Sequence, residues 1–165
     1  MWIERLDASH ALAYRELMLE AYDCHPQAFT SSVRERAAMP LGWWESRLTG
    51  KLDVVLGAFE AGRLAGIVGL AFETREKARH KATLFGMYVS AAFCRRGIGR
   101  QLLQAALAEA QSRPTLKVIQ LTVTAGNDPA LNLYRGCGFT PFGLEPMAVR
   151  VGEDYFDKIH MWREL

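Results

Sequence analysis

Hydrophobic and polar positions change their spacing several times along the chain, and these changes predict the order of secondary structure. Short apolar or alternating runs bounded by turn residues are typical of strands, whereas apolar residues three and four positions apart are typical of helices. Strands are expected at Trp2–Leu6, Asp53–Glu60, Leu64–Glu73, Ala82–Val89, Leu116–Thr124, Phe139–Arg150 and Tyr155–Glu164. Helices are expected from Ser9 to about Tyr22, in two short pieces between Ser32 and Leu48, and over Gly97–Ser112 and Pro129–Gly136.

Strands that alternate with helices in the middle of the chain, flanked by hairpins, predict a mixed sheet in one α/β domain over residues 1–165. Local signals predict where the helices begin and end. We expect Ser9 to cap the first helix, and Pro40 to split the second helical region in two. Asn127 or Asp128 is expected to cap the last helix, with Gly138 as the residue beyond its end.

The composition is that of an ordinary globular protein and excludes several function classes. Half of the residues are hydrophobic and 23% are charged, which argues against disordered and fibrous proteins. A formal net charge of +2 is too small to predict binding to nucleic acid or a membrane. The three cysteines and four histidines lie far apart without a CxxC pair, so we expect no metal site. No signal peptide and no apolar run of membrane-spanning length is visible, which predicts a cytoplasmic protein.

The first candidate site is the turn between the strand Ala82–Val89 and the following helix, where the chain reads RRGIGR from Arg95 to Arg100. Glycines let the backbone approach a ligand closely, and the first turn of a helix has N–H groups without an intrahelical partner. Together with the helix dipole, these groups favour a phosphate. The segment lacks the GK[ST] of a P-loop and the third glycine of a dinucleotide fingerprint. A tight turn with solvated arginines remains the structural alternative.

The second candidate segment runs from Asn127 to Phe139 and reads NDPALNLYRGCGF. Ala130, Leu133 and Tyr134 share one face of the expected helix, because they are spaced at i, i+3 and i+4. From this pattern alone, Tyr134 fits either a packed core aromatic or a functional phenol.

Together the two segments resemble the GCN5-related N-acetyltransferase (GNAT) family. Its signatures are a Q/R-x-x-G-x-G/A loop and a later N-x-x-A-x-x-L-Y-x-x-x-G-F run, in this order. The later run is complete here in Asn127, Ala130, Leu133, Tyr134, Gly138 and Phe139. The loop has Gly97 and Gly99, but Cys94 stands where the family has Gln or Arg. This departure weakens one side-chain contact and leaves the main-chain phosphate site in place.

The resemblance implies acetyl transfer from acetyl-CoA to an amine. It also implies a mixed, mostly antiparallel sheet, flanked by helices, that splays open between its fourth and fifth strands. The pantetheine arm would lie in that wedge, and Gly86 is consistent with a bulge in the fourth strand. The cofactor-binding residues implied are Met87, Tyr88, Val89, Arg95, Arg96, Gly97, Ile98, Gly99, Arg100 and Asn127.

By analogy with the family, the amine attacks the thioester directly in a ternary complex, without an acetylated enzyme. The N–H of Val89 would stabilise the oxyanion, and Tyr134 would protonate the departing thiolate. The strand Ala82–Val89 contains no acid, so Glu73 at the end of the preceding strand is the best candidate for the base. Less favoured bases are Asp23, Glu35 and His80, and water alone is a further option.

The acceptor is less defined by the sequence. Residues that we expect to line its pocket are Tyr22, Asp23, Phe29, Trp43 and Trp44, and the loop around Val151–Asp154 should help to wall it. An acid there would attract a cationic amine, whereas both Trp residues also fit a purely packing role. A small-molecule amine and a peptide amine stay open, as do a monomer and a homodimer. Two other functions compete: a catalytically silent acyl-CoA-binding sensor, and a phosphate-ligand protein without acetyl transfer.

Overall fold

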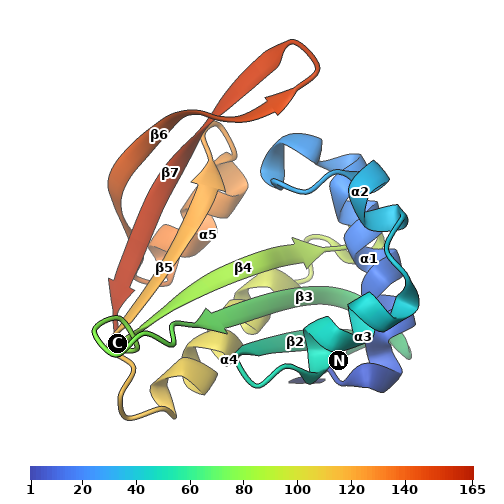
Figure 1. The fold of residues 1–165 in the computed structure, drawn as a ribbon, viewed down its shortest axis with the longest axis horizontal. Coiled ribbons are helices and arrows are strands. Elements are labelled where there is room, and N and C mark those ends of the chain that lie inside the picture. The colour runs from blue at the N-terminus through green and yellow to red at the C-terminus, as the bar shows by residue number, and fades with distance from the viewer.

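One seven-stranded sheet runs through the computed structural model, which describes residues 1–165 (Figure 1). Its strands are β1 (Trp2–Arg5), β2 (Asp53–Glu60), β3 (Arg63–Phe72), β4 (Lys81–Val89), β5 (Val118–Thr124), β6 (Thr140–Val151) and β7 (Asp154–Glu164). The α-helices are α1 (Ala11–Cys24), α2 (Val33–Ala37), α3 (Leu41–Thr49), α4 (Ile98–Gln111) and α5 (Asp128–Gly136). The strand order is β1-β2-β3-β4-β5-β7-β6, and only the β4–β5 pair is parallel.

The helix boundaries agree with the sequence patterns except at the first helix. The expectation that Ser9 caps this helix is wrong, because the carboxylate of Asp7 accepts the Ser9 N–H (2.9 Å) and starts a 3₁₀ turn over Ala8–His10 that leads into α1. The split at Pro40 is confirmed, since α2 and α3 lie on either side of it. Asn127 is the cap of α5, where its side chain accepts the Ala130 N–H (3.4 Å).

The expected opening of the sheet lies between β4 and β5. These strands pair only where Lys81–Thr83 faces Val118–Gln120, and beyond Thr83 they diverge (Figure 1). The pairing of β4 with β3 shifts register around Gly86, whose φ is +62°. This bulge lets Phe85 and Tyr88 pack on the same face of the sheet, although an uninterrupted strand would point them to opposite faces. The wedge therefore combines two departures from regular pairing.

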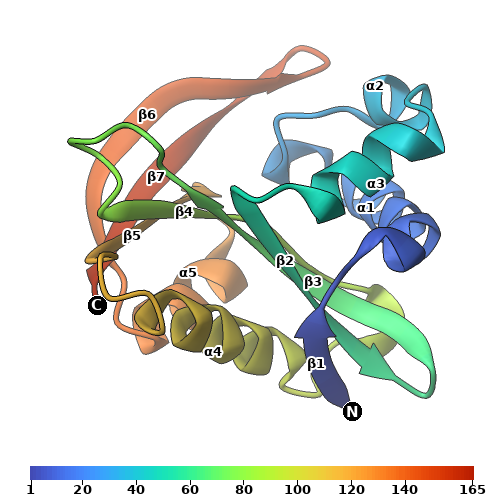
Figure 2. The ribbon, with the colours of Figure 1, turned by 60° about the horizontal axis from the view of Figure 1, so that its bottom comes forward.

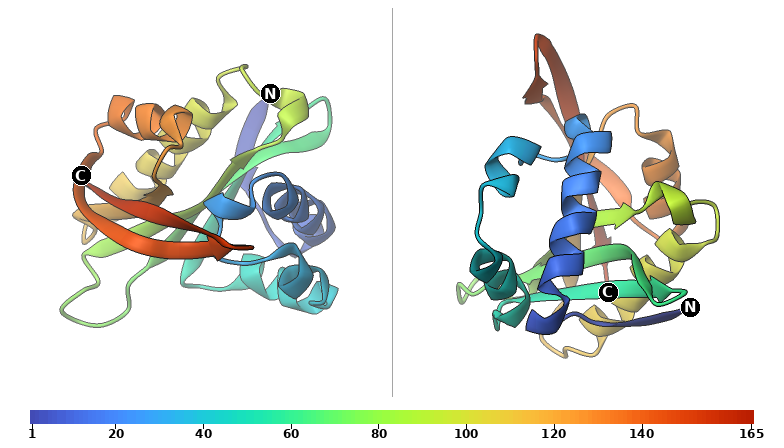
Figure 3. Two further views of the ribbon diagram at one scale, coloured as in Figure 1. Left: turned by 90° about the horizontal axis from the view of Figure 1, so that it is seen from above. Right: turned by 90° about the vertical axis from the view of Figure 1, so that its right-hand side faces the viewer.

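The helices cover the two faces of the sheet in two groups. Helices α1, α2 and α3 lie over one face, and α4 and α5 lie over the other (Figures 2 and 3). Leu102 and Leu103 of α4 are fully buried in the larger core, which also includes Phe139, three residues after the end of α5. Trp44 of α3 is 1% exposed and belongs to the core on the α1 side. Packing on both faces holds the diverging strands β4 and β5 in place.

The hairpin of β6 and β7 closes the sheet beyond β5 and extends past the helices (Figure 3, right). Because β7 and not β6 pairs with β5, the register sets Lys158 opposite Thr124 at the end of β5 where the sheet is open. The hydroxyl of Thr124 is itself fixed by donating to the carbonyl of Gln27 (2.8 Å). A segment from the N-terminal part thus meets β5 and β7 beside the wedge.

Candidate active site

The turn before α4 presents its backbone donors without partners inside the protein. Gly97 is the N-cap of α4 in the left-handed region (φ +76°), and no side chain caps this end of the helix. Arg95 also has positive φ (+63°). None of the N–H groups from Arg95 to Arg100 donates a hydrogen bond to another residue of the chain. These N–H groups can donate hydrogen bonds to the oxygens of a phosphate or diphosphate.

The three arginines of this turn have different surroundings. The Arg96 guanidinium contacts the Glu60 carboxylate (3.2 Å), and its Cζ lies 5.6 Å from the ring centroid of Phe93. Arg95 and Arg100 are exposed and have no carboxylate within salt-bridge distance. Positive charge on this side of the wedge therefore comes mainly from Arg95, Arg100 and the helix end.

A cavity of about 630 Å³ lies between the open end of β4 and the segment from β5 to α5. It is lined by Met87, Tyr88 and Val89 on one side, and by Gly126, Asn127 and Pro129 on the other. The N–H of Ser90 donates to Ala65 of β3, and successive N–H groups of a strand point to opposite edges. The N–H of Val89 therefore points to the open edge of β4, where an extended ligand can pair with the strand.

Gly99 brings the first turn of α4 against this cavity. A Cβ at this position would lie 3.5 Å from Leu133 Cδ2 and 3.5 Å from Met87 Cε, which is ordinary contact. A larger side chain would have to enter the cavity that Gly99 lines. The glycine thus keeps the space between the turn and the wedge open.

A second cavity, of about 350 Å³, adjoins the first on the side of α1, α2 and α3. Both cavities are lined by Phe29, Met87, Thr124, Asn127 and Leu133, so they meet at the mouth of the wedge. Tyr134 lines the second cavity and is 6% exposed. Burial raises the pKa of the Tyr134 phenol to about 12, so this side chain carries its proton at neutral pH.

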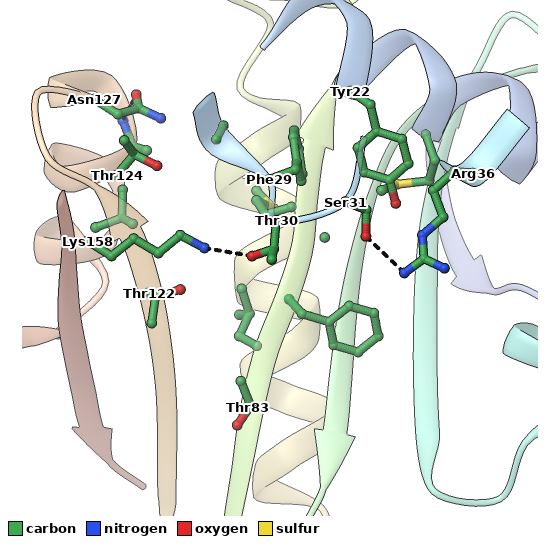
Figure 4. Close-up of a pocket in the computed structure, with 18 of the residues that line it drawn as sticks. Tyr22, Phe29, Thr30, Ser31, Arg36, Thr83, Thr122, Thr124, Asn127 and Lys158 are labelled. Atoms are coloured by element: carbon green, nitrogen blue, oxygen red, sulfur yellow. Dashed lines mark hydrogen bonds between the residues drawn. The ribbon is translucent and has the colours of Figure 1, made fainter. Parts of the chain in front are cut away.

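The lining of the second cavity is aromatic and cationic. It includes Arg36, Arg47 and Lys158, whereas no Asp or Glu occurs among its 24 lining residues. Figure 4 shows Arg36 beside Tyr22 and Ser31 at one end, with Lys158, Thr124 and Asn127 at the other. Burial raises the pKa of Tyr22, an effect that the Arg36 charge opposes, and burial raises the pKa of Tyr14 to about 12. Both phenols therefore stay neutral and do not compensate the arginine charges.

The structure does not bring the expected base to either cavity. Glu73 is exposed just after β3, and its N–H donates to Lys81 at the end where β4 and β5 still pair. The wedge opens from Thr83 onward, toward the other end of β4. Glu73 lines neither cavity, and the same holds for Asp23, Glu35 and His80. The sequence prediction put Glu73 at the end of this strand and it lies one residue beyond β3, but the direction of the opening decides which end of the strand is near the cavities.

The expected acceptor-pocket residues are only partly brought together. Tyr22, Phe29, Trp43 and Trp44 line the second cavity, whereas Asp23 is exposed and lines neither cavity. The two tryptophans divide between the two interpretations: Trp44 is a core residue, and Trp43 is half-buried beneath Arg36. The loop Val151–Asp154 does not line the cavity.

Sequence reasoning missed the three cations of this cavity. Arg47 follows Trp43 by four positions, which is a local signal for contact on one helix face. Arg36 and Lys158 had no such signal, because Arg36 reaches Trp43 across the break at Pro40 and Lys158 enters through the pairing of β7 with β5.

Comparison with known proteins agrees with this geometry. The model of the acetyltransferase (GNAT) family matches residues 14–139, and the chain belongs to this family. A GNAT acetyltransferase from Streptococcus pneumoniae has a similar structure (TM-score 0.84, 22% identity, 99% of each chain covered). Ribosomal-protein-alanine N-acetyltransferase from Brucella melitensis is also similar (TM-score 0.80, 24% identity, 100% of each chain). So is yncA from Salmonella typhimurium, solved with its cofactor acetyl-CoA (TM-score 0.81, 23% identity, 100% of this chain and 94% of that one).

The family match identifies the chain as an acetyltransferase of the GNAT class. The splayed mixed sheet expected from the resemblance is confirmed by these structures. None of the helices is long and apolar enough to cross a membrane.

Proposed function

We propose that this protein is an N-acetyltransferase in which a primary amine attacks acetyl-CoA directly within a ternary complex. The meeting of the two cavities at Met87, Thr124 and Asn127 is the observation that carries the proposal. A cofactor arm in the larger cavity and an amine in the smaller one would approach each other from opposite sides of this point. Two reactants held in one site need no covalent enzyme intermediate.

The residues around the larger cavity fit coenzyme A. The unpartnered N–H groups from Arg95 to Arg100 would hold the diphosphate, with Arg95 and Arg100 adding charge. The pantetheine arm would lie along the open edge of β4 at Met87, Tyr88 and Val89, and Asn127 would contact it from the α5 side. Bound in this way, acetyl-CoA supplies the activated acetyl group as a thioester.

Proton handling at the meeting point falls to two groups of this chain. The N–H of Val89 would donate to the oxygen that becomes negative as the amine adds to the thioester carbonyl. The protonated phenol of Tyr134 would donate its proton to the sulfur as the carbon–sulfur bond breaks. Because the pKa of this phenol is about 12, it stays protonated and neutral at every pH at which the enzyme would work.

The amine would lose its proton without a carboxylate base. Lys158 lies opposite Thr124, at the end of the smaller cavity that meets the larger one, and nearby like charge lowers the pKa of an amine. The neutral amine, which has the lone pair that attack requires, is thereby favoured, and water takes the proton. We do not carry Glu73 into this mechanism, since it lies outside both cavities.

Release of free thiol from acetyl-CoA, measured over a panel of small amines, amino acids and short peptides, tests the proposal. We expect thiol release and the matching N-acetyl product by mass spectrometry for at least one acceptor. Binding of acetyl-CoA with no turnover on any acceptor would instead support the catalytically silent sensor. Absence of any stabilisation by acetyl-CoA in thermal melting would remove the cofactor assignment itself.

A further inference from the structure

We infer that the acceptor is a small amine that also carries an anionic carboxylate, as an amino acid does, and that Arg36 with Arg47 binds this group. The inference rests on the proposed function and specifies the substrate class of the same site. The smaller cavity, called the acceptor cavity from here on, has three cationic side chains and no acid among its lining residues, and the larger one is called the cofactor cavity. A site for a purely cationic amine or a lysine side chain would need the opposite sign.

Arg36 is held in place without being neutralised. Its Nη2 donates to the Ser31 hydroxyl (2.8 Å), and its Cζ lies 4.5 Å from the ring centroid of Trp43. Its Nε is buried and has no hydrogen-bond partner in the protein. No carboxylate lies within salt-bridge distance of Arg36, because the neighbouring Glu35 binds the N–H of Ser32 in a capping box. A buried guanidinium donor without a partner is costly unless a ligand completes it.

Arg47 adds a second cation to the same end of the cavity. Its Cζ lies 5.7 Å from the ring centroids of both Trp43 and Phe85. Its one acidic neighbour is Asp53, whose carboxylate oxygen lies 3.8 Å from Nη1, which is a long contact. Arginine forks onto a carboxylate with two parallel hydrogen bonds, which makes this pair suited to a planar oxyanion.

The two ends of the cavity have different partners, and this difference orients the acceptor. Thr124, Asn127 and Leu133 also line the cofactor cavity, so the amine must lie at their end. Tyr22, Arg36 and Trp43 line the acceptor cavity alone. Figure 4 shows Tyr22 and Arg36 on the far side from Asn127. A molecule with an amine at one end and a carboxylate at the other would match this polarity.

The size of the cavity favours a small molecule over a protein segment. Its volume of about 350 Å³ is near the lower limit of ligand pockets, which run from about 300 to 1,000 Å³. The aromatic rings of Tyr22, Phe29 and Trp43 offer apolar contact to the part of the acceptor between its two polar ends. The N-terminal amine or a lysine side chain of a protein would bring no carboxylate to Arg36.

The test compares each amino acid with its own primary amide, which keeps the amine and the side chain and removes the negative charge. The panel contains the standard L-amino acids together with β-alanine and γ-aminobutyrate, since the span of the acceptor is part of what is measured. For the best acceptor we expect the amide to lower kcat/KM by about tenfold to a hundredfold, as is typical for loss of a charged hydrogen-bonded pair. The loss should lie mainly in KM for the acceptor.

Three variants connect this preference to the proposed residues. Arg36→Gln should lower kcat/KM for the acid about as much as the amide does in the wild type, and should not lower it further for the amide. Arg36→Lys should recover part of the loss, because it keeps the charge without the fork. Arg34→Gln is the matched control, since Arg34 is an exposed residue of the same helix that lines neither cavity. All three should keep the KM for acetyl-CoA.

If thiol release is faster with the amides, or with amines that have no carboxylate, than with the amino acids throughout the panel, the inference is overturned and the proposed function stands. So would an Arg36→Gln variant that affects acid and amide equally. If acetyl-CoA binds but no acceptor is turned over, the proposed function fails, and calorimetric titration of the same acids into the CoA-bound protein decides the inference separately. Binding that weakens about tenfold or more in Arg36→Gln supports it, and acids that bind wild type and variant alike, or do not bind, contradict it.

Discussion

The two cavities that meet at the wedge are built from different parts of the chain. The cofactor cavity is lined mainly by short continuous segments, which are residues 25–29, the end of β4 and the stretch from the end of β5 into α5, together with Gly99 in the first turn of α4. The acceptor cavity is lined by residues from α1, α2, α3, β4, β5, α5 and β7. Backbone geometry is specified by local glycine spacing and helix caps, so the turn before α4 was predictable from the sequence. The charge of the acceptor cavity depends on which distant side chains the fold brings together.

The turn before α4 and the acceptor cavity also differ in the source of their positive charge. At the turn before α4, charge comes from unpartnered N–H groups and exposed arginines in water. In the acceptor cavity, arginines stack on aromatic rings and are partly removed from water, where each interaction is stronger. The first arrangement suits any diphosphate, and the second selects among acceptors.

The largest effect is expected at Tyr134, on the acceptor side of the meeting point. Replacing Tyr134 with Phe removes the proposed acid while keeping the ring against Phe139, so kcat should fall about a hundredfold or more, with little change in the KM for acetyl-CoA. Steady-state kinetics measures both. The exposed Tyr155 gives a control, Tyr155→Phe, with wild-type rates. An undiminished kcat in Tyr134→Phe would end the general-acid role.

The pH profile of the wild type tests the same residue without a substitution. Because the Tyr134 phenol has a pKa of about 12, it stays protonated through the accessible range. The rate should therefore rise with pH as the free amine loses its proton, and then stay level without a descending limb up to about pH 10. A descending limb with a midpoint near pH 8 or 9 would assign the acid to another group.

A smaller effect is expected on the cofactor side. Gly99→Leu would push a side chain into the wedge against Leu133 and Met87, and should raise the KM for acetyl-CoA about tenfold or more with a smaller change in kcat. Gly99→Ala is the matched control, since its Cβ would be at ordinary contact distance. Equal cofactor affinity in both variants would argue against a phosphate-binding site at this turn.

Asn127 belongs to both cavities and should show a mixed, smaller response. Asn127→Ala removes the cap of α5, which should lower the free energy of unfolding by about 1 kcal/mol, and it should raise the KM for acetyl-CoA a few-fold. Denaturant unfolding and kinetics measure the two parts. Asn132→Ala, at an exposed position of the same helix, should change neither. Lost stability with unchanged cofactor affinity would confine Asn127 to the cap.

The smallest effect is expected at Glu73. Because this carboxylate lies outside both cavities at the paired end of β4 and β5, Glu73→Gln should leave the pH–rate profile as in the wild type. A loss of rate that grows toward low pH would restore Glu73 as the base and contradict the cation-assisted deprotonation of the amine.

The fold was predictable from the chain to a large degree because its signals are local. Glycines at positions 97 and 138 take positive φ, and Asn127 caps α5, as the spacing indicated. The first cap was missed because Asp7 and Ser9 are both good capping residues, and the 3₁₀ turn before α1 selects Asp7.

By itself, then, the sequence determined the order of elements, the turn that presents free N–H groups and the buried tyrosine of α5. Each of these depends on residues within a few positions of one another, where propensity and capping act. Only the tertiary structure decided the direction in which the wedge opens and the gathering of Arg36, Arg47 and Lys158 around one cavity. Those follow from strand order and from packing between segments more than a hundred residues apart, for which no local pattern carries information.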